Sequence, residues 1–328
     1  MTVADLTERE LVARIQQQLA PPPSWLTVGI GDDAAVVENE RNRVEVLTVD
    51  ALIDGVHFDR RFTPPTAIGH RALAVNLSDL AAMGATPRLA LLSLALPATL
   101  TCEEFDGVIS GIATEAMAHR LTVAGGNLTR TPGPLTIDIT AIGTAKRRGV
   151  LTRSGARPGD LIYVSGAIGA AAAGLDMLRT GAATPSEACV FRYLRPSARV
   201  RLGQMLGRNR AASACIDLSD GLADGVSRIA DASGVGMTVD ADALPIEPEA
   251  RRWFEDQGLD PVVAALGGGD DYELLFTVRP RQRGRLRAAF QQGGVPLTKI
   301  GVCTPDTRCV LRTAAGDVPF PSGFSHFR

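Results

Sequence analysis

At 328 residues the chain is long enough for two domains, each with its own hydrophobic core. Hydrophobic residues make up 45% of the sequence, which is typical of folded globular proteins and excludes long disordered segments. The formal net charge is −2, so the chain lacks the overall positive charge of a protein that binds nucleic acid or anionic membranes. We therefore expect small-molecule ligands, no nucleic-acid partner and no membrane partner.

The cysteines point to a reducing compartment. There are five of them, an odd number, and they form no C-x-x-C pair, which disfavours a zinc site or a disulfide framework. The first ten residues contain neither the basic nor the apolar segment of a signal peptide. A cytoplasmic location is expected.

The first half of the chain predicts a mixed α+β domain. Thr7 followed by Glu10 is a capping box that begins a helix. Apolar residues at helical spacing predict a second helix over 66–83, and Thr101 begins a third that ends near residue 119. Apolar runs predict strands at 34–37, 44–49, 89–96, 121–124 and 135–144.

The basic segment Lys146-Arg147-Arg148-Gly149 marks a change in pattern. We place a domain boundary there, with an N-terminal domain of residues 1–148 and a C-terminal α/β domain of residues 149–328. Short strands alternate with helices after the boundary. The predicted strands are 161–164, 214–218, 237–239, 274–278 and 297–302, and the predicted helices are 170–178, 222–232 and 283–291.

Aspartates follow apolar segments, or lie on an apolar helix, in both halves of the chain. They are Asp32, Asp33, Asp50, Asp79, Asp217 and Asp220. Any one of them alone is also typical of turns and helix caps, and Asp220 is placed to cap the helix at 222–232. Carboxylates without histidine or thiolate partners are the ligands that Mg²⁺ prefers, so the whole set predicts a magnesium site.

Three glycine-rich segments are expected to be loops whose backbone amides approach phosphate. They are Gly125-Gly126-Asn127, Ser165-Gly166-Ala167-Ile168-Gly169 and Gly267-Gly268-Gly269. None matches the P-loop pattern, and the nucleophile motif G-x-S-x-G is absent from the sequence. Phosphoryl transfer needs positioning and charge neutralisation more than a nucleophilic side chain, and it fits this pattern best.

Three further residues have two readings each. Arg153, at the predicted domain junction, fits a phosphate contact and equally an interdomain ion pair. His57 fits a substrate contact, although a lone histidine is more often structural. Phe324 is suited to stack on a flat ring or to attach the C-terminus. Nothing local in the sequence decides between these alternatives.

Six motifs, in order along nearly the whole chain, resemble those of the thiamine-monophosphate kinase family, within the aminoimidazole ribonucleotide synthetase-like superfamily. They begin at Gly29 (GIGDD), Asp50 (DALIDGVHF), Ala74 (AVNLSDLAAMG), Leu151 (LTRSGARPGD), Ile216 (IDLSDGL) and Gly268 (GGDDYEL). The resemblance implies ATP-dependent phosphorylation of thiamine monophosphate to thiamine diphosphate, the final step in making this cofactor. It implies direct in-line transfer with several magnesium ions, and a homodimer in which the mixed N-terminal domains form a barrel.

The resemblance also implies roles for individual residues. The magnesium ligands would be Asp33, Thr48, Val49 (through its backbone), Asp50, Asp79, Asn127, Asp217 and Asp220. ATP would contact Gly126, Asn127, Arg153 and Ser219, and thiamine monophosphate would contact His57, Asp270 and Phe324. The residues with catalytic roles would be Asp33, Asp220 and Arg153.

Two positions depart from the family pattern. Asn127 stands where the family usually has aspartate, which removes a charge from one magnesium contact, and Asp270 stands where it commonly has glutamate. Two alternatives remain at this point: a related ATPase that activates a carbonyl oxygen as a phosphate, and a nucleotide-binding protein without turnover. The selenium and hydrogenase-maturation relatives need a cysteine near a terminus, whereas the first cysteine here is Cys102.

Overall fold

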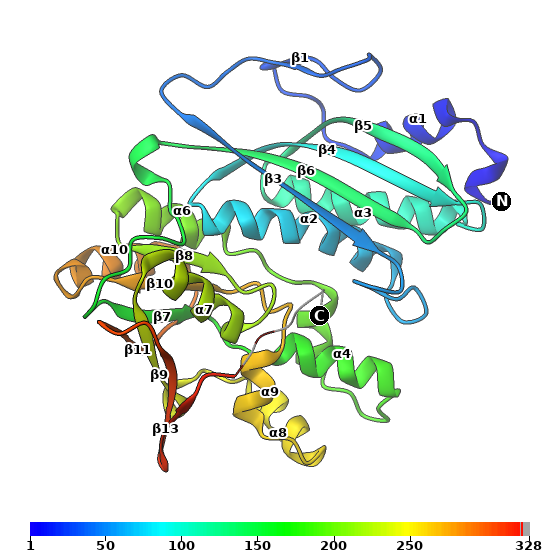
Figure 1. Ribbon diagram of the computed structural model, residues 1–328. Helices are drawn as coiled ribbons and strands as arrows, with labels where there is room; N and C mark the ends of the chain where they lie inside the picture. Colours follow the sequence, from blue (N-terminus) through cyan, green and yellow to red (C-terminus); the bar gives the residue numbers. More distant parts are fainter. Residues whose placement is uncertain (322, 324–328) are drawn as a thin grey trace. The chain divides into compact units, whose positions relative to one another are not determined.

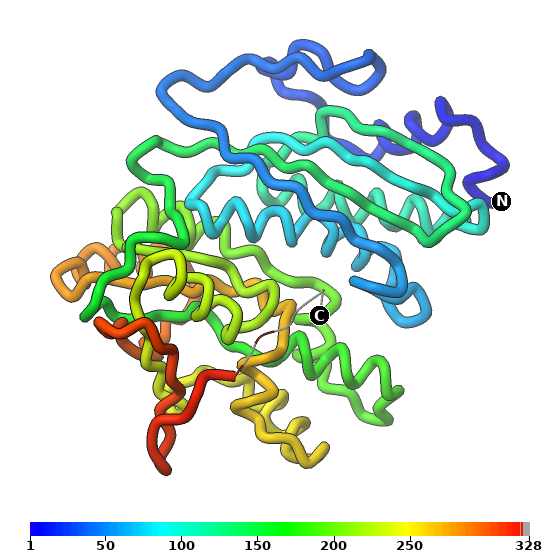
Figure 2. The backbone as a smooth tube through the Cα atoms, viewed as in Figure 1, coloured from blue at the N-terminus to red at the C-terminus, as the bar shows by residue number. Residues whose placement is uncertain are grey.

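A computed structural model describes residues 1–321 and 323 of the chain. It divides into two compact units (Figures 1 and 2). Unit 1 comprises Met1–Leu80 and Thr86–Lys146, and unit 2 comprises Ala81–Ala85 and Arg147–Arg328. The short segment Ala81–Ala85 therefore leaves the N-terminal part of the chain and packs with unit 2.

Unit 1 is a four-stranded sheet with helices on one face (Figure 1). Its elements are η1 (Val3–Asp5), α1 (Glu8–Gln18), β1 (Leu26–Val28), β2 (Val36–Val37), β3 (Val44–Ile53), α2 (Pro65–Ala82), β4 (Thr86–Pro97), α3 (Cys102–Ala118), β5 (Thr122–Thr131) and β6 (Thr136–Ala145). The strand order is β3-β6-β4-β5, with β5 parallel to β4 and the other pairs antiparallel, while β1 and β2 form a separate ribbon.

The helix starts of unit 1 follow the predicted capping boxes. The Thr7 hydroxyl accepts the Glu10 backbone N–H at 3.3 Å, and the Glu10 carboxylate accepts the Thr7 N–H at 2.7 Å. Thr101 and Glu104 make the same reciprocal pair at the start of α3. Each pair satisfies two backbone donors that the helix itself leaves without partners.

The expected loop at Gly125-Gly126-Asn127 is wrong, because these residues lie inside strand β5. Gly126 is paired with Leu92 of β4. A Cβ atom at Gly126 would lie 1.9 Å from the Leu92 carbonyl oxygen, so the glycine allows two strands to approach closely. The glycine here serves strand packing.

Unit 2 is a seven-stranded sheet with helices between its strands. Its elements are η2 (Arg147–Gly149), β7 (Leu161–Ser165), α4 (Ala170–Thr180), α5 (Glu187–Leu194), α6 (Val200–Asn209), β8 (Ala214–Asp217), α7 (Leu222–Ser233), β9 (Gly236–Asp240), η3 (Ala241–Ala243), α8 (Pro248–Asp256), α9 (Pro261–Gly267), β10 (Leu274–Val278), η4 (Pro280–Gln282), α10 (Arg283–Gly293), β11 (Leu297–Thr304), β12 (Cys309–Thr313) and β13 (Gly316–Pro319). The order is β13-β12-β9-β11-β7-β10-β8, and only the β9–β12 pair is parallel.

The mixed α+β class predicted for the chain is confirmed by these two units. In unit 2, every residue of β8, at the edge of the sheet, and of its neighbour β10 is buried. Helices α5, α6, α8 and α9 and strands β12 and β13 were not predicted. Within residues 1–321 and 323, no helix has the length and apolar character that crossing a membrane requires.

Candidate functional site

In unit 1, strand β3 and helix α2 bring two predicted ligands together. The Thr48 hydroxyl on β3 donates a hydrogen bond to the carboxylate of Asp79 on α2. The two residues are 31 positions apart in sequence, so the contact depends on the helix lying against this face of the sheet. A hydroxyl and a carboxylate oxygen side by side are hard donors of the kind that Mg²⁺ binds.

Asp50 lies on the same face of β3 as Thr48, since side chains alternate along a strand and these two are two positions apart. Val49, between them, points its side chain to the opposite face, where it is 58% exposed. Only the backbone of Val49 is therefore available on the Thr48 side. That placement agrees with the backbone role that the family resemblance implies.

Asp32 and Asp33 occupy an exposed turn before β2. The Asp32 carboxylate accepts the backbone N–H of Asp33 at 2.9 Å, and Gly31 just before it has a φ of +119°. This is the local pattern in which an aspartate stabilises a turn with its own side chain. Asp32 thus shapes the turn, and Asp33 carries the second carboxylate at its surface.

His57 lies in the turn after β3. Its Nδ1 accepts the backbone N–H of Ile53 at 3.1 Å, and its own backbone N–H donates to the Ile53 carbonyl at 2.9 Å. In the neutral imidazole this leaves the proton on Nε2. The ring orientation is therefore fixed by the turn.

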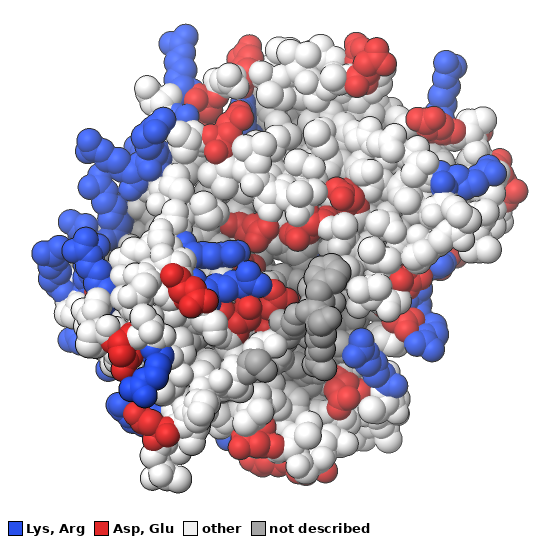
Figure 3. Space-filling model, in the orientation of Figure 1, with Lys and Arg blue, Asp and Glu red and all other residues white. Residues whose placement is uncertain are grey.

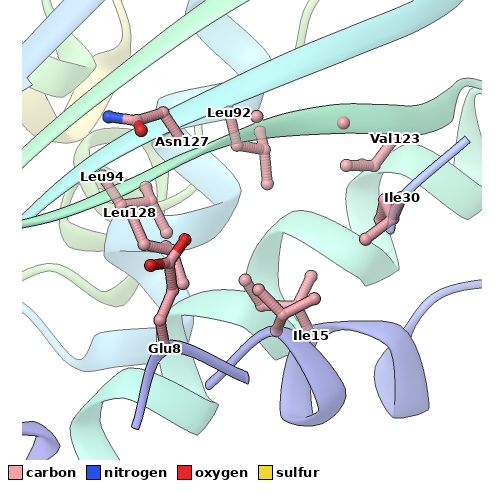
Figure 4. Close-up of a pocket in the computed structure, with 11 residues that line it drawn as sticks. Glu8, Ile15, Ile30, Leu92, Leu94, Val123, Asn127 and Leu128 are labelled. Carbon is pink, nitrogen blue, oxygen red and sulfur yellow. The ribbon is translucent and has the colours of Figure 1, made fainter. Parts of the chain in front are cut away.

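Asn127 lies on the other face of the same sheet. Across the sheet, Asn127 of β5 is paired with Ser93 of β4, Ser93 with Asp138 of β6, and Asp138 with Ala51 of β3. Residues paired in this way point to the same face of the sheet. Ala51 is next to Asp50 in β3, so this face is the one opposite Asp50. Figure 4 shows the Asn127 side chain pointing away from a cavity on the helix side of the sheet, whose lining includes Leu92, Leu94 and Leu128. Within unit 1 the structure therefore does not bring Asn127 to Thr48 and Asp79.

That cavity, of about 70 Å³, is lined mostly by aliphatic side chains from α1, β4 and β5, and Glu8 is the one charged residue among those that line it. Such a lining accepts apolar groups. Gly126 and Asn127 belong to its lining, but none of the predicted carboxylate ligands does.

In unit 2 the predicted residues lie where strand β8 ends and helix α7 begins. Asp217 is the last residue of β8 and is buried, Ser219 is exposed, and Asp220 is partly exposed with Arg228 Nη2 at 3.8 Å from its carboxylate. Gly221 follows with a φ of +92°, and a Cβ atom there would lie 2.8 Å from the carbonyl oxygens of Leu266 and Gly268. The glycine allows the loop before β10 to approach this turn closely.

Backbone hydrogen bonds join the two loops. The N–H of Asp270 donates to the Ser219 carbonyl at 2.8 Å, and the N–H of Tyr272 donates to the Leu218 carbonyl at 2.9 Å. Asp270, a predicted substrate contact, is thereby adjacent to the predicted ATP and magnesium segment. The residues from Leu218 to Asp220 and from Gly269 to Glu273 form one structure, which we call the double loop.

The double loop contains unusual backbone geometry. Asp270 and Tyr272 have φ values of +70° and +49°, although neither is glycine. The Tyr272 hydroxyl donates to the Asp270 carboxylate at 3.2 Å. Left-handed non-glycine residues cost conformational free energy and persist only where the surroundings impose them.

A buried charge cluster imposes this geometry. Glu273 is fully buried, and its carboxylate forms ion pairs with Arg192 and Arg199 and accepts the Ser165 hydroxyl at 2.6 Å. Arg192 also donates to the Asp271 carbonyl at 3.1 Å. A buried carboxylate is stable only with such partners, so the cluster fixes the C-terminal part of the double loop.

Asp271 is attached to the start of helix α4. Its carboxylate accepts the Gly169 N–H at 2.8 Å and the Ala171 N–H at 3.5 Å. Burial raises the pKa of the Asp271 carboxyl to about 7, because loss of water disfavours the charged form more than these amides and Arg192 favour it. Sequence reasoning missed Asp271, Tyr272 and Glu273 as contributors, although all three lie in the GGDDYEL motif.

Arg153 is exposed, and its carbonyl accepts the Ser233 hydroxyl at 3.2 Å. Phe324, the remaining predicted substrate contact, lies outside the described residues. Among residues 1–321 and 323, no three histidine, cysteine, aspartate or glutamate side chains form a group that could hold a metal ion. Mg²⁺ is commonly bound by one or two carboxylates together with phosphate oxygens and water, so a smaller carboxylate group is compatible with it.

Comparison with known proteins gives the family. Residues 31–145 match the family model for the AIR synthase related protein, N-terminal domain, and residues 157–313 match the C-terminal domain of the same family. A thiamine-monophosphate kinase of Salmonella typhimurium is 39% identical over 328 residues, covering 98% of each chain. The chain belongs to the thiamine-monophosphate kinase family. The resemblance found in the motifs is thereby confirmed.

Solved structures agree with this family assignment. A thiamine-monophosphate kinase from Stenotrophomonas maltophilia superposes with a TM-score of 0.83 at 39% identity, covering 93% of this chain and 96% of that one. The structure described as AaThiL complexed with AMPPCP and TMP superposes with a TM-score of 0.78 at 32% identity, covering 100% and 99%. A hydrogenase maturation protein in complex with ATP, at 20% identity and a TM-score of 0.77, shares the fold.

Proposed function

We propose that the chain transfers the γ-phosphoryl group of ATP to thiamine monophosphate, giving ADP and thiamine diphosphate. An oxygen of the substrate phosphate attacks the γ-phosphorus in line, one P–O bond forms, and the bond to the ADP oxygen breaks. The observation that carries the proposal is family membership over nearly the whole chain, with relatives named thiamine-monophosphate kinase. A relative complexed with AMPPCP and TMP supports the same pair of substrates.

We propose that the residues named from the motifs in each unit serve this reaction, with residues 1–148 and 149–328 as the two domains. Asp33, Thr48, Asp50 and Asp79 would hold magnesium from the first, together with the Val49 backbone. Asp217 and Asp220 would hold magnesium from the second domain, and Asn127 remains a proposed magnesium contact. The oxygen-only donors, with the Thr48 hydroxyl directly beside Asp79, fit Mg²⁺. When bound, the metal neutralises charge on the phosphate oxygens.

The chain's own groups orient the substrates. Gly126, Asn127, Ser219 and the Arg153 guanidinium are proposed to contact ATP, with Arg153 stabilising charge on the transferred group. His57, Asp270 and Phe324 are proposed to contact thiamine monophosphate. Asp270 is suited to the cationic thiazolium, since its carboxylate is fixed by the Tyr272 hydroxyl within the double loop.

We further propose that the chain is a cytoplasmic homodimer in which the outer sheet faces of unit 1 form a barrel. On the face opposite the helices, Leu47, Val49 and Leu91 are 63%, 58% and 37% exposed. Water contact with three large aliphatic side chains is unfavourable, and a second copy would remove it. Leu47→Lys should convert the dimer to monomer in sedimentation equilibrium, whereas a monomeric unsubstituted chain would refute the proposal.

The activity is tested by supplying ATP, Mg²⁺ and thiamine monophosphate to the full chain and separating the products by chromatography. We expect ADP and thiamine diphosphate in equal amounts. ADP without thiamine diphosphate would indicate an ATPase of another specificity, and no turnover with retained nucleotide binding would indicate a non-catalytic protein. Either result would contradict the proposed function.

A further inference from the structure

A hollow in unit 2 has a strongly basic lining. Its volume is about 340 Å³, and it lies between η2, the end of α6 and the segment from η4 to α10. Four arginines line it, and none of its eleven lining residues is acidic. The four are Arg148, Arg210, Arg279 and Arg285.

The charge around the hollow is one-sided. The chain as a whole has 34 basic and 36 acidic residues, yet segments 146–153, 195–213 and 279–299 contain no aspartate or glutamate. Figure 3 shows basic side chains gathered at the left edge of the view, over α6 and α10. Within residues 1–321 and 323, none of the four lining arginines forms a salt bridge. No carboxylate of the described residues therefore lies within ion-pair distance of these four guanidinium groups, which repel one another.

Two buried polar atoms at the hollow have no protein partner. They are Nε of Arg279 and Oε1 of Gln282. Buried polar groups in folded proteins nearly always have a hydrogen-bond partner, so two orphaned atoms in one wall need an explanation. Arg279 Nε has almost no accessible surface, so an anion oxygen accepts from it once the side chain shifts toward the hollow. Rotating the Gln282 amide by half a turn would present its NH₂ group to the same ligand.

Arg210 gives an independent indication. It ends α6 with a φ of +50° and a ψ of +45°, a left-handed position that glycine or asparagine normally occupies. Arginine pays conformational free energy at this position, and the guanidinium that it supplies lines the hollow. A costly backbone position with its side chain in a pocket is typical of a binding site.

We propose that this hollow binds the phosphate or diphosphate group of a small anionic ligand, at a second site separate from the proposed kinase site. Guanidinium groups stay charged and bind phosphate oxygens in pairs, and four of them around one hollow match a compact, multiply charged anion. Ser213, also in the wall, donates to the buried Asp160 at 2.7 Å, so that carboxylate is already engaged. The proposal does not depend on the kinase activity.

The test uses inorganic diphosphate as the probe, in isothermal titration calorimetry of the full chain at low salt without magnesium. We expect Arg210→Gln with Arg285→Gln to weaken binding at this site at least tenfold. The matched control, Arg283→Gln with Arg287→Gln, removes the same charge from the start and middle of α10 without changing the hollow's lining, and should weaken binding less than twofold. Equal weakening in both variants would show only general electrostatic attraction and would overturn the proposal.

A second variant separates binding from folding. Arg210→Gly relieves the left-handed strain, so its midpoint of thermal unfolding should rise while diphosphate affinity falls at least fivefold. Unchanged affinity in Arg210→Gly or in the double variant would overturn the proposal, since diphosphate would then bind elsewhere, including the proposed kinase site. Tighter binding of a short DNA duplex than of diphosphate, weakened equally by both double variants, would indicate a polyanion surface and would also overturn it.

Discussion

The proposed functional residues of unit 1 and those of unit 2 are held in place in different ways. In unit 1, Thr48 and Asp79 come from a long strand and a long helix, and regular secondary structure alone directs them to one another. In unit 2, the double loop has two left-handed non-glycine residues and depends on the buried Glu273 with its arginines. A site on regular secondary structure requires no strained backbone, whereas a site on loops requires buried ion pairs to hold its backbone in place. The following predictions test this contrast, beginning with the largest expected effect.

Glu273→Gln should lower the free energy of unfolding by about 3 kcal/mol, because it removes the buried charge that pairs with two partly buried arginines. The matched variant in unit 1 is Glu104→Gln, which loses the charge paired with Arg60 at 2.6 Å but keeps a side-chain oxygen for capping α3. That change should cost less than about 1 kcal/mol. Chemical denaturation measures both. Equal losses would show that the double loop is no more dependent on its charges than a surface pair.

Asp79→Asn and Asp220→Asn should each lower kcat at least roughly tenfold, about 1.4 kcal/mol, because each removes charge stabilisation from the proposed metal site. The control is Asp231→Asn, an exposed aspartate on α7. Steady-state kinetics at saturating magnesium measures kcat for the variants and the control. If the kcat of a variant is within twofold of that of the unsubstituted enzyme, the substituted residue is not part of the catalytic centre.

The stability of unit 2 should fall as pH rises from about 4 to about 7. The pKa of Asp271 is raised to about 7 in the folded chain against an ordinary 3.8, so the folded state keeps a proton that the unfolded state has lost in this interval. The expected change is on the order of 4 kcal/mol, since each pKa unit corresponds to about 1.4 kcal/mol. Asp271→Asn should flatten this pH dependence in urea unfolding, and an unaltered slope would assign it to other groups.

Tyr272→Phe should raise KM for thiamine monophosphate about threefold and leave KM for ATP unchanged, because it removes the hydroxyl that orients the Asp270 carboxylate. The control is Tyr163→Phe, a ring stacked on Phe276 at a centroid distance of 5.8 Å. Thermal unfolding should hardly change in either variant. If the KM values for both substrates rise in Tyr272→Phe, the hydroxyl stabilises the whole double loop and does not act through Asp270 alone.

The smallest effect is expected for Asn127→Asp, about a twofold decrease in the magnesium concentration at half-maximal rate. A carboxylate adds attraction for a cation near the phosphates, but position 127 points to the outer face of the sheet, away from Thr48 and Asp79. A magnesium titration checks it. An unchanged magnesium dependence of the rate would show that position 127 is not near the metal.

The strand of Thr48 and the helix of Asp79 could be predicted from periodicity, and the family resemblance placed both residues around magnesium. Their direct hydrogen bond was not predicted. The orientation of Asn127 could not be predicted, because it depends on the register between β4 and β5. Arg192 and Arg199 carry no local signal, as their partner Glu273 is 81 and 74 residues away. Long-range pairs of this kind are determined by the tertiary fold, and a periodic pattern contains no information about them.

The pairing of Ser165 with Glu273 spans 108 residues of chain and has a consequence for synthesis. A ribosome must release six helices (α4 to α9), β8 and β9 after Ser165 before the glutamate that completes the pair emerges. Closing so long a loop is entropically costly and delays the contact. The buried ion pairs of the double loop therefore form late, and a chain truncated before residue 273 lacks the carboxylate that joins Ser165, Arg192 and Arg199.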